Sequence, residues 1–246
     1  MLRSLRKILG YEIRASDGAI GSAHDLYFDD GKWTVRYLVV DTGGWPSGRK
    51  VLISPREVGR ADWTLRLLTV SLTREKVKRS PGVRSDLPVS RQEEEAIGAY
   101  YGWTPYWGGM YGTISGGPVV VAGAKAATQT AEEVSGDPCL RSMREVTGYH
   151  ILASDGQIGH VEDLIADTDD WIVRYLVIDT RNWLPGRKVL VAPDWVTSVD
   201  WQASLVRLDL SRVQVKRSPE FDPSTPVNRE YEARLYDYYG RPGYWY

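Results

Sequence analysis

The chain has 246 residues, 42% hydrophobic and 26% charged, a composition typical of a folded globular protein. Its 31 basic and 32 acidic residues nearly balance, which argues against a dedicated nucleic-acid-binding protein with its usual basic surplus. The single cysteine, Cys139, excludes a disulfide within the chain. No apolar run approaches the roughly 20 residues that span a membrane. The basic N-terminus lacks the apolar run of a signal peptide, so we expect a cytoplasmic protein.

The first 80 residues carry the signals of a small strand-rich domain. A Ser-Asp-Gly segment at 16–18 predicts a hairpin turn, because glycine readily takes positive φ. Runs of alternating or β-branched residues predict strands, at residues 20–28, 33–40, 51–53 and 65–72. Thr73 then predicts the start of a short helix that reaches Lys78. Strands this short and closely spaced indicate a small closed barrel or curled sheet, filled by its own side chains.

The segment after this strand-rich part predicts a helix. Ser90 and Glu93 form a capping-box pattern, in which each side chain satisfies a free backbone N–H of the first helical turn. We expect the helix to run through Tyr100, with Ile97 and Tyr101 on the same face as Tyr100.

The whole pattern then returns at a constant offset of 138 residues, without a gap. Ala15–Gly18 recurs as Ala153–Gly156, and Val35–Val39 recurs as Val173–Val177. About half of the positions between residues 10 and 55 are identical, which indicates a duplicated domain. The chain therefore divides into a first repeat, a linker and a second repeat, at residues 1–108, 109–138 and 139–246.

The linker at 109–138 is rich in Gly, Ala, Ser and Thr and is expected to be flexible. It does not fix how the repeats meet. Two arrangements stay open: a pseudo-two-fold pair within one chain, or a homodimer of chains.

Both repeats resemble one known family, the PRC-barrel domain, on an ordered set of short motifs. The first copy has these at Asp17-Gly18, Ile20-Gly21, Asp25-Leu26, Asp29-Asp30, Tyr37–Val40 and Val51–Pro55. The second has them at Asp155-Gly156, Ile158-Gly159, Asp163-Leu164, Asp167, Tyr175–Ile178 and Val189–Pro193.

The resemblance implies a mainly β protein. It would have two small β-barrels, each followed by a short helix and a helical aromatic tail. The family includes the cytoplasmic domain of the photosynthetic reaction-centre H subunit and the C-terminal domain of a ribosome maturation factor. Its known members mostly work through protein–protein contact. We expect the chain to lack the membrane helix of the former and the additional N-terminal barrel of the latter.

Residues with catalytic or metal-binding chemistry are few. The three histidines, His24, His150 and His160, have no histidine at the equivalent position of the other repeat. A metal or acid–base role shared by both repeats is therefore excluded, and we expect no metal, no cofactor and no catalytic residue. Cys139 is interpreted as an incidental free thiol.

Three aspartates do recur and are the strongest candidates for acid–base chemistry: Asp17, Asp25 and Asp41 return as Asp155, Asp163 and Asp179. A structural role is favoured for all of them. Asp17 belongs to the turn, and Asp25 and Asp41 are expected at strand ends, accepting backbone hydrogen bonds.

The aromatic tails are the best candidate interface, because aromatic clusters often anchor protein–protein contacts. The repeated tail aromatic residues are Tyr100, Tyr101, Tyr106, Trp107, Tyr238, Tyr239, Tyr244 and Trp245. The alternative is that each tail packs on its own repeat or on the sister repeat.

These patterns favour a non-enzymatic interaction or scaffold protein with an unidentified protein partner and no nucleic acid. One alternative is an RNA- or ribosome-associated assembly factor. Others are a soluble factor associated with a photosynthetic complex and a hydrolase that uses the repeated aspartates.

Overall fold

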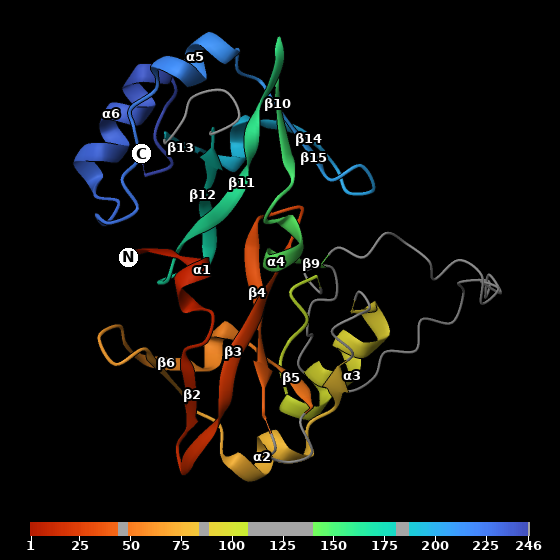
Figure 1. Cartoon of the computed structure of the whole chain (residues 1–246). Helices are drawn as coiled ribbons and strands as arrows, with labels where there is room; N and C mark the ends of the chain where they lie inside the picture. Colours follow the sequence, from red (N-terminus) through yellow and green to blue (C-terminus); the bar gives the residue numbers. More distant parts are fainter. Residues whose placement is uncertain (44–48, 84–88, 108–139, 181–186, 246) are drawn as a thin grey trace, which may run out of the picture.

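The computed structural model describes residues 1–43, 49–83, 89–107, 140–180 and 187–245 (Figure 1). The predicted linker at 109–138 and Cys139 lie outside the described residues.

The first repeat consists of short strands and helices. In chain order they are β1 (Leu2–Ser4), α1 (Leu5–Ile8), β2 (Glu12–Ala15), β3 (Gly18–Asp29), β4 (Thr34–Asp41), β5 (Lys50–Ile53), the 3-10 turn η1 (Pro55–Glu57), β6 (Val58–Asp62), β7 (Leu67–Val70), α2 (Arg74–Arg79), β8 (Gly82–Val83) and α3 (Arg91–Tyr101).

The second repeat has the same order except for β8. Its elements are β9 (Leu140–Ser142), α4 (Met143–Val146), β10 (His150–Ala153), β11 (Gly156–Asp167), β12 (Ile172–Asp179), β13 (Lys188–Val191), η2 (Pro193–Trp195), β14 (Val196–Asp200), β15 (Leu205–Leu208), α5 (Arg212–Arg217) and α6 (Arg229–Tyr239).

Local sequence signals account for most of these boundaries. The predicted turn joins β2 to β3, and the Thr73 side chain caps α2 by accepting from the Lys76 N–H. Ser90 and Glu93 form the predicted capping box at the start of α3. The predicted hairpin, short helix and tail helix of the first repeat are therefore confirmed.

Five strand pairs are common to both repeats, and among the described strands the first repeat has a further antiparallel pair, β5–β8. In the first, β2–β3, β3–β4, β4–β5 and β6–β7 are antiparallel and β2–β7 is parallel; in the second, β10–β11, β11–β12, β12–β13 and β14–β15 are antiparallel and β10–β15 is parallel. A mainly β fold is thus confirmed. Two separate closed barrels were expected, but the described strands do not form them. They belong to one open 15-stranded sheet with β14 and β6 at its two ends.

A repeated glycine explains the Ile-Gly motif. Gly21 in β3 has a φ of 150°, and a Cβ there would lie 2.0 Å from the carbonyl oxygen of Asp41 in β4. Gly159 has a φ of 153° and the same 2.0 Å approach to the Asp179 carbonyl oxygen. Only glycine allows two backbones to come this close at such a φ.

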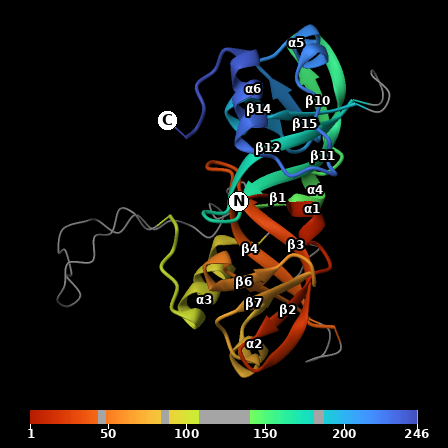
Figure 2. The same ribbon diagram turned by 90° about the vertical axis from the view of Figure 1, so that its left-hand side faces the viewer.

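The repeats exchange their first strands, which is why one sheet forms. β1 pairs with β11 of the second repeat, and β9 pairs with β3 of the first. The N-terminus consequently lies at the junction, with β1, α1 and α4 side by side between the two repeats (Figure 2). This exchange buries Leu2 and Leu140 at the junction and connects the two cores.

A second contact joins the starts of β4 and β12, where Thr34 pairs with Ile172. The Val35 N–H donates to the Trp171 carbonyl at 2.8 Å, and the Val173 N–H donates to the Trp33 carbonyl at 2.7 Å. Both tryptophans have positive φ, 53° for Trp33 and 59° for Trp171, a conformation that costs a bulky residue free energy. Each of these two turns supplies a carbonyl to the first strand residues of the other repeat.

Candidate functional site

The aromatic tails are positioned by the helices α3 and α6. Each helix has 11 residues and ends at a glycine in the left-handed conformation, Gly102 with φ 77° and Gly240 with φ 63°. A left-handed residue reverses the chain direction at a helix end. The residues that follow each helix therefore fold back over the repeat from which they come.

The tyrosines at the ends of the helices bond to the preceding short helices. The Tyr100 hydroxyl donates to the Lys76 carbonyl at 2.7 Å, and the Tyr238 hydroxyl donates to the Gln214 carbonyl at 2.7 Å. Tyr238 keeps 38% of its surface exposed.

The next tyrosine of each tail lies deeper. Tyr101 stacks on Trp103 with ring centroids 4.2 Å apart, and Tyr239 packs on Trp195 at 4.6 Å. The two tryptophans come from different positions of the repeats, since Trp103 follows α3 whereas Trp195 belongs to η2. The same ring contact is thus made by different parts of the chain.

The last aromatic pair of each tail lies against arginines. These cations sit 3.9–4.2 Å from the ring centroids, where a cation is attracted to the negative face of the ring. The four pairs are Arg36–Tyr106, Arg91–Trp107, Arg174–Tyr244 and Arg229–Trp245. All eight tail aromatic residues therefore contact their own repeat, and their role in binding another protein stays a prediction.

A buried glutamate lies beneath each tail. Glu232 is 2% exposed, and its Oε1 accepts from the hydroxyls of Tyr175 at 2.7 Å and Tyr244 at 2.8 Å. Its Oε2 lies 3.1 Å from Arg229. This carboxylate holds the strand, the helix and the tail together.

Glu94, the equivalent of Glu232 in the first repeat, makes longer hydrogen bonds. Glu94 is 3% exposed, and its Oε1 lies 3.4 Å from Arg91 and 3.5 Å from the Tyr106 hydroxyl. Its buried Oε2 has no hydrogen-bond partner among the described residues. Burial raises the pKa of Glu94 to about 7, although Arg91 and the hydroxyls of Tyr106 and Tyr37 oppose the rise.

The sequence reasoning missed both glutamates, although a signal was present. Arg91 and Glu94 recur as Arg229 and Glu232 at the same offset of 138. A repeated arginine and glutamate three residues apart on a helix indicates a retained polar contact on one helical face.

A pocket of about 440 Å³ lies beside Glu94, where the tail of the first repeat meets a loop of the second. Its walls include the rings of Trp103, Tyr106 and Trp107 and the side chain of Pro105, and residues 168–171 close the opposite side. Its volume falls within the roughly 300–1,000 Å³ typical of ligand pockets. It is our candidate functional site.

The repeated aspartates have structural partners. Asp25 is 5% exposed and lies within β3, not at a strand end as predicted. Its carboxylate accepts from the Ser142 hydroxyl at 2.5 Å and from the Arg144 N–H at 3.2 Å, both in the second repeat. Burial raises the pKa of Asp25, and these hydrogen bonds oppose the rise.

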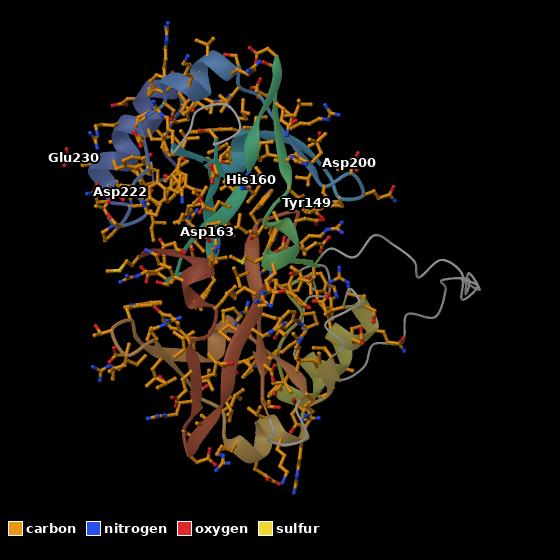
Figure 3. The ribbon with its side chains drawn as sticks, viewed as in Figure 1. Tyr149, His160, Asp163, Asp200, Asp222 and Glu230 are labelled. Carbon is orange, nitrogen blue, oxygen red and sulfur yellow. The ribbon has the colours of Figure 1, made fainter. Side chains whose placement is uncertain are left out.

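Asp163 makes the reciprocal contact with the first repeat. It accepts from the Ser4 hydroxyl and from the Arg6 N–H, the latter at 3.0 Å. Figure 3 shows Asp163 close to the junction between the repeats. Its pKa is likewise raised by burial.

Three of the other recurrent aspartates, Asp17, Asp155 and Asp41, accept hydrogen bonds from backbone groups. Asp17 accepts from the Arg74 N–H at 2.7 Å, and Asp155 accepts from the Arg212 N–H at 2.7 Å, so each also stabilises the start of a helix. Asp41 ends β4 and accepts from the Gly43 N–H at 2.8 Å, as predicted for a strand end. Asp179 is buried at the end of β12.

The histidines are dispersed. His24 lies on β3 with its Nε2 3.5 Å from Arg144, and burial together with the cations Lys50 and Arg144 lowers its pKa. His150 lies 3.0 Å from Gln157, and His160 is on β11 (Figure 3). Within the described part of the chain, no group of three potential metal ligands is found.

Comparison with known proteins identifies the first of the two repeats. Residues 2–70 match the PRC-barrel domain. The match runs from the exchanged strand β1 to the end of β7, so the PRC-barrel domain includes the strand that pairs with the other half of the chain. No curated protein matches the chain. Among the described residues, no helix has the length and apolarity needed to cross a membrane.

Proposed function

We propose that the chain is a tandem PRC-barrel protein and acts as a non-enzymatic scaffold that binds a partner protein. Residues 139–246 would be the second PRC-type unit, because its strands pair as those of the matched first unit do. The exchanged strands β1 and β9 would make the two units one rigid body that presents both tails in a fixed arrangement.

The observation that carries this proposal is the pocket at the junction. Aromatic and proline side chains form much of its wall, and it is completed by residues from both repeats, Arg36 on one side and Trp171 on the other. Partly exposed aromatic side chains around a depression are the usual anchors of a protein–protein contact.

The alternative of a hydrolase that uses the repeated aspartates is less well supported than the scaffold proposal. Asp25 and Asp163 fasten the repeats to each other, and the pocket is lined by neither of them. The RNA or ribosome factor and the photosynthetic-complex factor rest on the family resemblance alone.

The test places a photo-reactive amino acid at Thr104, an exposed residue at the rim of the pocket, in the full chain inside its native cells. The matched control is Pro242, the exposed equivalent in the second repeat. We expect a discrete crosslinked protein from position 104 and little or none from position 242. Absence of any crosslinked protein at position 104 would contradict the proposed function.

A further inference from the structure

The β6–β7 hairpin of the first repeat and the β14–β15 hairpin of the second are built around the same pair of rings. Tyr11 packs on Trp63 with ring centroids 6.2 Å apart and 56° between the ring planes, and Tyr149 packs on Trp201 at 6.1 Å and 56°. The tips of the two hairpins project from opposite sides of the molecule (Figure 1). Since the frames match, the tips differ through the residues that they carry.

The tip of the first hairpin exposes an apolar side chain. Leu65 keeps 72% of its surface exposed, more than any other large hydrophobic residue among those described, and Ala203 takes its place in the second repeat. The partly buried Leu9 lies beside this tip, because its carbonyl accepts from the Arg66 guanidinium at 3.3 Å. The equivalent of Leu9 is Thr147. The second tip therefore has smaller or more polar residues at both positions.

The first tip is also more basic than the second. Arg66 is exposed, with its guanidinium 5.3 Å from the Tyr11 ring, and Arg60 is exposed on β6. The second repeat has serine at both equivalent positions, Ser204 and Ser198. Two cations of the first hairpin are thus absent from the second.

A third cation of the first repeat lies against the same pair of rings. Arg3 lies over Trp63 at 4.5 Å, and its equivalent Arg141 lies over the corresponding ring of the second repeat at 4.1 Å. Arg141 is paired with Asp30 at 3.0 Å. Thr168 stands at the position equivalent to Asp30, so no equivalent carboxylate neutralises Arg3.

The carboxylates near the tips do not offset this difference in charge. Asp62 and Asp200 each accept a backbone N–H of their own turn at 2.9 Å, so each hairpin has one aspartate in the same role. Glu12, beside the first tip, is paired with Arg14 at 2.8 Å. The first tip therefore combines an exposed leucine with an excess of positive charge.

We propose that the tip of the first hairpin, residues 63–66, docks on an anionic membrane surface. Leu65 enters the boundary between headgroups and acyl chains, where an apolar side chain is buried. Arg60 and Arg66 lie against the lipid phosphates, and each cation near such a surface strengthens binding roughly fivefold. A projecting apolar tip suits a lipid surface, whose headgroups part around it, whereas a folded partner would need a matching cavity. Neither Leu65 nor Arg66 lines the pocket near Thr104, so this docking is separate from the proposed partner site.

The test is flotation of the full chain with vesicles of phosphatidylcholine that contain about 30% phosphatidylglycerol, compared with vesicles of phosphatidylcholine alone. We expect binding to the anionic vesicles to be at least about tenfold stronger, and to fall when salt rises from about 0.05 to about 0.5 M, because salt screens the charges. No binding to the anionic vesicles, or equal binding to both, would overturn the proposal. Retention of the chain on immobilised polyglutamate without vesicle binding would assign the surface to an acidic protein segment instead.

Two variants introduce the residues of the second repeat at the tip. Leu65→Ala should weaken vesicle binding about five- to tenfold, and Arg66→Ser about fivefold. Serine fits this turn, because Ser204 has a φ of 52° where Arg66 has 55°. Arg217→Ser removes an exposed cation at the end of α5, remote from the tip, and should leave binding within about twofold (Figure 1). Unchanged binding in both hairpin variants would overturn the assignment.

A fluorescent label reports the contact itself. The nitrobenzoxadiazole dye attached to Leu65→Cys, in a chain that also carries Cys139→Ser, should shift its emission to the blue with the anionic vesicles, because the dye leaves water. The same dye on Ala203→Cys is the matched control on the other tip and should not shift. No shift at position 65, or an equal shift at position 203, would overturn the placement of the first tip in the membrane.

Discussion

Asp25 accepts a hydrogen bond from the hydroxyl of Ser142, a residue 117 positions later in the other repeat. The same carboxylate accepts the Arg144 N–H at the start of α4, and Asp163 does the same for α1. An aspartate at a helix N-terminus satisfies N–H groups that have no partner within the helix. The repeated aspartate is therefore a reciprocal clamp between the two repeats.

Asp25→Ala should lower the free energy of unfolding by about 1–3 kcal/mol, because it leaves the Ser142 hydroxyl and the Arg144 N–H without an acceptor. Asp25→Asn should cost less, since its amide oxygen can still accept. Urea denaturation measures both changes. Hydrogen exchange should show faster exchange of the Arg144 amide.

Asp163→Ala is the matched control for this clamp. It should expose the Arg6 amide and leave the Arg144 amide protected, whereas Asp25→Ala should do the opposite. Equal loss of protection at both amides in either variant would show that the two clamps do not act separately.

The strands and helices of each repeat are predictable because their signals are local. The alternation in β3, the Ser90 capping box and the turn at Asp17 each specify structure within a few residues. The junction is different. β1 and β9 have three residues each and no periodicity of their own, so their pairing depends on the other repeat.

The candidate site was only partly predictable, for a related reason. Comparing the repeats for identities finds the tail aromatic residues and could have found Glu94. It cannot find the pocket, because residues 168–171 of the second repeat close a space formed by the tail of the first. Likewise, the sequence around Asp25 predicts a residue at a strand end, because nothing local indicates its hydrogen bond to the Arg144 N–H of the other repeat.

Gly21→Ala should destabilise the protein by about 3 kcal/mol or more, or prevent folding. A Cβ at this position would lie 2.0 Å from the Asp41 carbonyl oxygen, so β3 and β4 must separate. Thermal unfolding followed by circular dichroism measures the loss. Gly59→Ala is the control, because its Cβ would have no neighbour closer than 3.7 Å. Similar melting temperatures for the two variants would contradict the close approach.

Leu235→Ala should cost about 2–5 kcal/mol, because Leu235 is fully buried and its truncation leaves a cavity beneath α6. Ile97→Ala tests the equivalent site beneath α3, where Ile97 is 1% exposed. Tyr238→Ala on the exposed face of α6 should cost only about 1 kcal/mol, mainly its hydrogen bond to Gln214. Small and equal effects in all three would indicate tails that do not pack on their own repeats.

Glu94 should make stability depend on pH between about 4.5, its ordinary pKa, and 7, its raised pKa in the folded protein. Across this range the unfolded chain releases the proton first, so the folded protein binds more protons and its stability falls as the pH rises. The groups that face Glu94 are Arg91, Arg36 and the hydroxyls of Tyr37 and Tyr106, and these oppose but do not cancel the effect of burial. The total loss attributable to Glu94 is about 3 kcal/mol.

Glu94→Gln cannot release this proton, so its stability should fall less steeply than that of the wild type over the same range. Urea denaturation at half-unit intervals from pH 4.5 to 8 measures both profiles. Glu95→Gln, one position further along α3 and exposed, should keep the wild-type slope. Parallel profiles for the wild type and Glu94→Gln would show that Glu94 has an ordinary pKa in the folded protein.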